Sequence, residues 1–232
     1  MVKINLVWVL LFSFLACNNQ PIQDKDSTTI VDSPIANTQV TRQSAEIAID
    51  SSNYSGVLLL YSDSLQIDNQ NFSIYNQNNS VFTTVASKNS NEPYSDKLKG
   101  KILAYYPDYY IVHFNAEKLS DGVYRVKVGT SSKIVKATKY VEYLSLPDYV
   151  LKFFVITTSA NPLRSSSSET ASQIKGIDYK QLSLKCLEIN GDWVKVACNA
   201  ECEGCPEGET DITGWVRWRK DGKIIVKQHY AC

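Results

Sequence analysis

Hydrophobic and polar positions divide the chain into three stretches with different patterns. Residues 4–15 are almost all apolar, with only Asn5 and Ser13 interrupting the run. Residues 18–43 are nearly all polar, and their few apolar residues follow neither a helical nor a strand period. From Gly56 onward, short apolar runs alternate with turn signals. This order predicts a targeting segment, a flexible tether and a folded body.

The folded body is predicted to consist of short strands. Val57–Tyr61 is a continuous apolar run, which is typical of a buried strand. Two predicted hairpins surround tight-turn signals: Lys101–Tyr106 and Tyr109–Phe114 flank Pro107-Asp108, and Lys185–Ile189 and Trp193–Cys198 flank Asn190-Gly191-Asp192. Val123–Val128 and Trp215–Arg219 are further predicted strands. No segment longer than ten residues has helical periodicity, so we expect an all-β fold.

Strand alternation predicts which side chains face the core. Along Trp193–Cys198 it places one set of residues on the inner face, namely Val194, Val196 and Cys198. The outer set is Trp193, Lys195 and Ala197. In the earlier hairpin the matching inward set is Tyr110, Val112 and Phe114. Each hairpin is therefore expected to bury one face.

The two hairpins belong to a longer internal match. The segment Tyr106–Val112 lies 84 residues before Asn190–Val196, and Gly122–Lys127 lies 92 residues before Gly214–Arg219. A Lys-Ile strand follows in both places, at Lys133-Ile134 and Lys223-Ile224. The shared order predicts two diverged copies of one small β unit, with eight additional residues in the second copy.

The charge balance excludes several classes of partner. The chain has 24 basic and 24 acidic residues, and removing residues 1–16 takes away a single Lys. Without a basic block there is no electrostatic footprint for nucleic acid. The same balance argues against polybasic attachment to a membrane surface. We therefore expect neither interaction.

The first 17 residues carry an export pattern. Lys3 precedes the apolar run, and the run ends at Ala16-Cys17. A Cys at this position resembles the lipobox of bacterial lipoproteins, which implies that residues 1–16 are a signal peptide and that Cys17 is lipidated. Phe14 stands where an aliphatic residue is usual, so an ordinary cleaved signal is the alternative. We expect a protein anchored by lipid in the bacterial envelope, with residues 17–50 forming a tether that spans roughly 30 Å.

The second copy resembles the bacterial SH3 (SH3b) domain. The resemblance is carried by Asn161–Ser165, Glu188–Val196 and Gly214-Trp215-Val216, and Ser166-Ser167-Ser168 replaces the usual Gly-Pro-Ser. It implies two tandem SH3-like small β barrels. Their expected bounds are 51–142 for the SH3-like domain and 143–232 for the SH3b domain, with a Cys-rich insertion at 197–213. The first copy is SH3-like through the internal repeat.

Aromatic residues are the candidates for ligand binding. Trp193 and Trp215 fit the open side of an SH3-like barrel, where aromatic side chains form a groove for extended peptides. Alternation places Trp215 and Trp218 on opposite faces, so at most one of them reaches such a groove. Family position adds Tyr109 and Arg164. The alternative is that the three Trp residues pack the small barrel.

The remaining cysteines are expected to meet an oxidising compartment. Cys198, Cys202 and Cys205 follow a C-x₃-C-x₂-C spacing, and Cys232 ends the chain. We interpret these four as disulfide cysteines that restrain the polar insertion, with Cys186 as the free thiol. A structural zinc site that uses Cys232 or His229 as fourth ligand is the alternative. Sequence does not give the connectivity.

No pattern points to catalysis. His113 and His229 lack a nearby nucleophile motif, and we interpret them as surface or packing residues. No cofactor or metal is expected. The sequence predicts a non-catalytic binding module that recognises a cell-wall (peptidoglycan) peptide or an envelope protein. A structural subunit of an envelope complex is the main alternative, and a thiol redox protein using Cys202 and Cys205 is the weaker one.

Overall fold

A computed structural model describes residues 49, 53–86, 95–179, 182–198 and 212–230. All of them belong to one compact unit, residues 42–232. Antiparallel strands dominate this unit, and the expected all-β class is confirmed. Cys17 and the tether lie outside the described residues, so they stay predictions.

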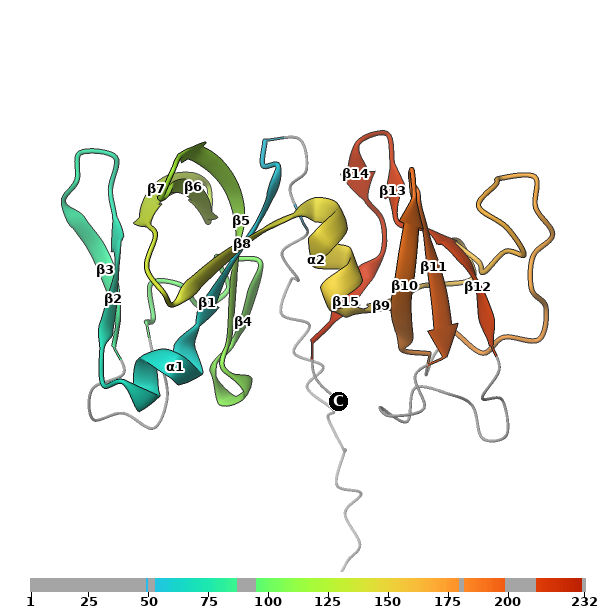
Figure 1. The fold of residues 1–232 in the computed structure, drawn as a ribbon, viewed down its shortest axis with the longest axis horizontal. Coiled ribbons are helices and arrows are strands. Elements are labelled where there is room, and N and C mark those ends of the chain that lie inside the picture. Colours follow the sequence, from blue (N-terminus) through green and yellow to red (C-terminus); the bar gives the residue numbers. More distant parts are fainter. Residues whose placement is uncertain (1–48, 50–52, 87–94, 180–181, 199–211, 231–232) are drawn as a thin grey trace, which may run out of the picture. The chain divides into compact units, whose positions relative to one another are not determined.

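Among the described residues, the first sheet contains eight strands. Figure 1 labels each of them, from β1 to β8. Its path runs β3-β2-β7-β6-β5-β1-β8, and β4 pairs with the N-terminal residues of β5. The strands are β1 (Gly56–Tyr61), β2 (Asn71–Tyr75), β3 (Val81–Ala86), β4 (Ala104–Tyr106), β5 (Ile111–Ser120), β6 (Val123–Val128), β7 (Ser131–Lys136) and β8 (Val141–Ser145).

Strand β1 and residues 112–116 of β5 are buried on both faces, which explains the unbroken apolar run at Val57–Leu60. On one face, Leu58 lies opposite Phe114 in a core formed by the first sheet. On the other face, Val57 and Leu59 join a second core that includes residues of the later strands. The two sheets therefore share a hydrophobic core through β1.

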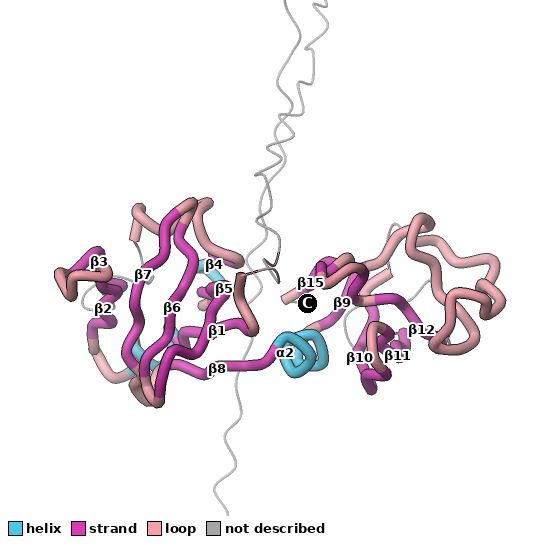
Figure 2. The backbone as a smooth tube through the Cα atoms, turned by 90° about the horizontal axis from the view of Figure 1, so that it is seen from above, coloured by secondary structure: helices cyan, strands magenta, loops and turns pink. Residues whose placement is uncertain are grey.

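In the described part of the chain, two short α-helices connect strands. Helix α1 (Ser62–Ile67) follows β1, and α2 (Leu146–Lys152) connects β8 to β9, as the path of the chain in Figure 2 shows. The N-cap of α2 is Ser145, whose side chain accepts a hydrogen bond from the amide of Asp148. Tyr149 and Val150 of α2 are fully buried in the shared core.

The second sheet has five strands in the order β12-β11-β10-β9-β15. They are β9 (Phe154–Ile156), β10 (Leu184–Asn190), β11 (Trp193–Cys198), β12 (Thr213–Arg217) and β15 (Lys227–His229). A separate two-stranded ribbon joins β13 (Arg219–Lys220) to β14 (Lys223–Ile224). Among the described strands, the two end strands of each sheet do not pair with each other.

Both predicted hairpins are present. Asn190 pairs with Trp193 around Gly191, whose φ of 58° is easily reached by glycine. Tyr106 pairs with Ile111 around a 3₁₀ turn, η1 (Pro107–Tyr109). In both copies the second hairpin strand pairs with the next strand, β6 or β12. The following strands differ, because β7 pairs with β6 whereas β14 pairs with β13.

The predicted inner faces are partly confirmed. Val194, Val196, Val112 and Phe114 are fully buried. The inward position of Tyr110 is wrong: its side chain is 39% exposed, because a φ of 58° at this residue interrupts the strand alternation. The predicted domain boundary between residues 142 and 143 falls within β8.

Candidate functional site

The residues predicted for ligand binding lie in two places. Cross-strand register places Trp193 opposite Arg217 and Trp215 opposite Lys195, so these side chains share one face of the second sheet. Arg164 lies beside Trp215, and the two residues exchange backbone hydrogen bonds of 2.9 and 2.8 Å. The structure therefore brings three predicted residues together, whereas Tyr109 lies on η1 in the first sheet.

The loop at residues 165–170 packs over the face of the second sheet that carries Trp193. Arg217 pairs with Glu169, and Asn190 donates to Ser167 over 3.0 Å. Because Asn190 and Arg217 are the cross-strand neighbours of Trp193, the loop at 165–170 is held over that face. Trp193 is accordingly only 9% exposed. Trp215 retains partial exposure, while Trp218 is fully buried and donates its indole N–H to Gly191.

The cysteines offer little reactive chemistry in the described part of the chain. Cys186 is a free, buried cysteine, as its place within a strand predicts, and burial raises its pKa to about 12. Cys198 ends β11, but Cys202, Cys205 and Cys232 lie outside the described residues. The disulfide, zinc and redox hypotheses for this group therefore stay predictions.

The Cys186 thiol is expected to resist alkylation until the protein unfolds, because its thiolate is disfavoured at neutral pH. Mass spectrometry of the Cys186 peptide after iodoacetamide treatment, with and without urea, measures this. Rapid labelling of Cys186 in native protein would contradict it.

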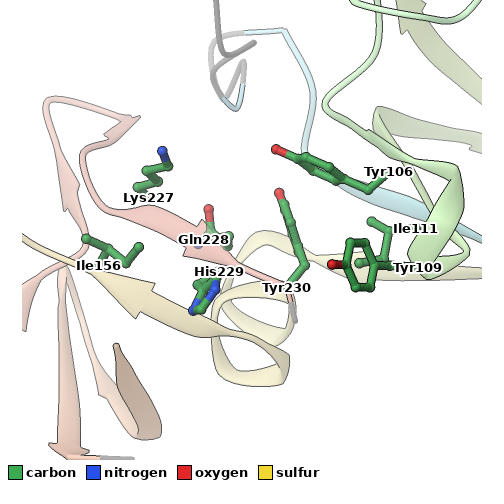
Figure 3. A pocket seen from close by; sticks show the side chains of 8 residues that line it. All are labelled: Tyr106, Tyr109, Ile111, Ile156, Lys227, Gln228, His229 and Tyr230. Carbon is green, nitrogen blue, oxygen red and sulfur yellow. The ribbon is translucent and has the colours of Figure 1, made fainter. Parts of the chain in front are cut away.

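A cavity of about 300 Å³ lies where residues from both sheets meet (Figure 3). One wall comes from the η1 turn and its flanks, and the other from β9, β15 and the residue after β15. The lining residues are Tyr106, Tyr109, Ile111, Ile156, Lys227, Gln228, His229 and Tyr230. This aromatic pocket is the candidate functional site.

The η1 turn exposes its tyrosines at the pocket. Tyr109 is 64% exposed, and Tyr106 is also exposed. Tyr110 adopts the left-handed conformation, which bulky residues rarely occupy. Its carbonyl accepts a 2.9 Å hydrogen bond from the buried Ser62 hydroxyl, which fixes the turn on helix α1. Strained backbone of this kind is concentrated at functional sites.

A cluster of aromatic rings supports the pocket from behind. The centroid of His113 lies 5.1 Å from that of Tyr230 and 5.2 Å from that of Phe153. Phe153 also packs edge-on against Tyr149, and Tyr230 lies 5.9 Å from Tyr106. These contacts hold the Tyr230 ring in a defined place at the pocket wall.

The polar groups of the cluster form a directed chain. The Tyr149 hydroxyl donates to the Tyr230 hydroxyl over 2.9 Å. Since Tyr149 has one hydroxyl proton, its oxygen accepts from Nδ1 of His113, which is 3.1 Å away. His113 therefore carries its proton on Nδ1, and the chain of donors runs from His113 through Tyr149 to Tyr230.

Both buried groups of this chain are held neutral. Burial, together with the Lys152 charge, lowers the pKa of His113 to about 3. Burial and the neighbouring Tyr230 raise the pKa of Tyr149 well above its usual value. Neither group changes protonation near neutral pH, so the chain orients the Tyr230 hydroxyl rather than moving protons.

The side-chain amide of Gln228 lacks a hydrogen-bond partner at the pocket. Gln228 is only 6% exposed, and its backbone pairs with Val155 of β9. No described residue hydrogen bonds its Nε2 atom, although buried side-chain donors normally have a partner. In Figure 3 the Gln228 amide stands between Lys227 and Tyr230. Because Gln228 lines the pocket, this donor is a candidate contact for a ligand there.

Comparison with known proteins found no matching protein-family model, no matching curated protein and no matching solved structure. The site is therefore interpreted from its geometry and chemistry. In the described ranges, no helix has the length and apolar character needed to cross a membrane. The described side chains also contain no group of three or more His, Cys, Asp or Glu residues placed to hold a metal ion.

Sequence reasoning identified Tyr109 but missed Tyr230 and Gln228. A signal for the first wall exists in the sequence, since four tyrosines surround Pro107-Asp108. The second wall has a weaker signal, the run Gln228-His229-Tyr230 near the end of the chain. Their contact is visible only in the fold, because more than one hundred residues separate them in sequence.

Proposed function

We propose that this protein is an envelope-anchored, non-catalytic binding module that recognises a cell-wall peptide or an envelope protein through the aromatic pocket. Cys17 provides the lipid anchor in this proposal, and residues 17–50 provide the tether. The finer fold assignment, two tandem SH3-like units, is supported by the hairpin and following strand that recur in both sheets.

The observation that carries the proposal is the Gln228 amide in an aromatic cavity. A buried amide that lacks a hydrogen-bond partner and lies beside tyrosine rings is suited to a ligand that has apolar surface and its own amide groups. Peptides have both. A binding role is favoured over a catalytic one because the buried His113 and Tyr149 are shifted away from the pKa range of a general acid or base.

Retention on purified peptidoglycan tests the cell-wall form of the proposal. Residues 18–232, which include the whole folded unit, should sediment with peptidoglycan sacculi. Tyr109→Ala should reduce the bound fraction about tenfold, because an exposed aromatic anchor is lost. The change Ile67→Ala removes another exposed apolar side chain, outside the pocket, and should leave retention unchanged.

A third variant compares the two candidate surfaces. Trp215→Ala alters the face of the second sheet that sequence reasoning favoured, far along the sheet order from β15. If Trp215→Ala abolishes retention while Tyr109→Ala has no effect, the pocket is the wrong site. If neither change affects retention, the proposal for this pocket fails.

The alternative role as an assembly subunit is favoured by one observation. Tyr106, Tyr109 and Tyr110 are all exposed on one turn, and clustered tyrosines are typical of protein interfaces. Cross-linking in native envelopes separates the two roles: a single protein partner captured through this turn, without peptidoglycan retention, favours assembly.

A further inference from the structure

The aromatic pocket follows the edge of a strand. Residues Lys227 to Tyr230 are consecutive, and all four line the cavity. Side chains of consecutive strand residues point to opposite faces of a sheet. A cavity that touches residues 227–229 therefore reaches the edge of β15, and the lining residue Ile156 of β9 shows that it also extends over the sheet beside Lys227.

Among the strands that the structure describes, β15 lies at the end of the second sheet. Its known partner is β9, with Gln228 opposite Val155 and His229 opposite Phe154. An end strand with a cavity beside it is suited to β-strand addition, in which main-chain hydrogen bonds provide affinity and side-chain pockets provide specificity. Gln228, whose side-chain Nε2 atom has no hydrogen-bond partner, is the middle residue of β15.

Size and charge limit the occupant. A cavity of about 300 Å³ is at the small end for ligand sites, which suits two or three small residues. None of its eight lining residues is acidic, and Lys227 supplies an ammonium group at one end (Figure 3). A ligand carboxylate placed near Lys227 meets an opposite charge and no like charge within the lining.

We propose that the pocket binds a short extended peptide of small residues with a free carboxylate, as an added strand on β15. The inference rests on the proposed function, since it names the ligand class of the same site. The peptide backbone pairs with β15, the tyrosines cover its side chains, the Gln228 amide meets a peptide carbonyl, and the carboxylate lies beside Lys227.

Tri-alanine is a suitable probe, monitored through the amide NMR spectrum of residues 18–232. Binding should shift the amide signals of β15 and of the η1 turn. C-terminal amidation of the probe should weaken binding about tenfold, as should Lys227→Gln in the protein. The control Lys223→Gln changes an exposed lysine outside the pocket and should have no effect.

N-methylation of the probe tests strand pairing directly. Adjacent N–H groups of an extended peptide point in opposite directions, so only one of the two peptide N–H groups faces β15. Methylation at one position should weaken binding about tenfold, and methylation at the other should be tolerated. Equal effects at both positions would overturn the pairing.

The outcomes separate this inference from the proposed function. Absence of tri-alanine binding at millimolar concentration, with retention on sacculi that still depends on Tyr109, overturns the inference and leaves the proposed function standing. Failure of both assays overturns both. Binding of tri-alanine with the expected methylation pattern, without sacculus retention, supports the inference and directs the function toward a protein partner.

Discussion

Replacing Trp218 by Ala is expected to lower the free energy of unfolding by about 3–5 kcal/mol. Trp218 is fully buried in the core that both sheets share, and its indole N–H donates to the Gly191 carbonyl over 3.0 Å. The change leaves a cavity and an unsatisfied carbonyl in the Asn190–Asp192 turn. Urea denaturation followed by circular dichroism measures the loss.

Trp215→Ala provides the matched control. Trp215 is the same residue type three positions earlier, on the partly exposed face of β12. Its replacement should cost about 1 kcal/mol or less, since little buried volume is removed. Equal losses for the two variants would contradict the assignment of Trp218 to the core and Trp215 to the surface.

The parts of the fold that were predicted from sequence depend on local signals. Asn190-Gly191-Asp192 specifies a hairpin because Gly191 adopts a positive φ at low cost. Val57–Leu60 identifies a buried strand because every position is apolar. Trp193 shows the limit of such signals. Alternation alone places it at the surface, but the loop at 165–170 covers that face through Glu169 and Ser167.

The aromatic pocket could not be predicted because its two walls meet only in the folded chain. Gln228 has no local signal of burial, and its low exposure follows from pairing with Val155 across 73 residues of sequence. His113 is likewise an ordinary strand residue in the sequence. It becomes buried because β5 is covered on both faces, which strand alternation does not reveal.

Lowering the pH from 7 to 5 is expected to reduce the free energy of unfolding by about 2 kcal/mol through His113. The folded protein holds the pKa of His113 at about 3, whereas the ordinary pKa of a histidine side chain is 6.5. Between these values the unfolded chain binds a proton and the folded chain does not. The stabilisation is therefore complete above pH 6.5 and is lost progressively as the pH falls toward 3. Urea denaturation at a series of pH values measures the slope.

Two histidine variants assign this slope to a residue. His113→Gln keeps a side-chain donor for the Tyr149 hydroxyl but removes the titrating group, so its stability should be nearly constant between pH 5 and 7. His229→Gln alters the other histidine, which bonds to Ser183, and should preserve the wild-type slope. Asp68, whose pKa is lowered mainly by its hydrogen bond to Lys139, remains ionised over this range and does not imitate the effect. A wild-type protein equally stable at pH 5 and 7 would show that His113 is not buried in its neutral form, and the oriented Tyr149–Tyr230 chain would lose its support.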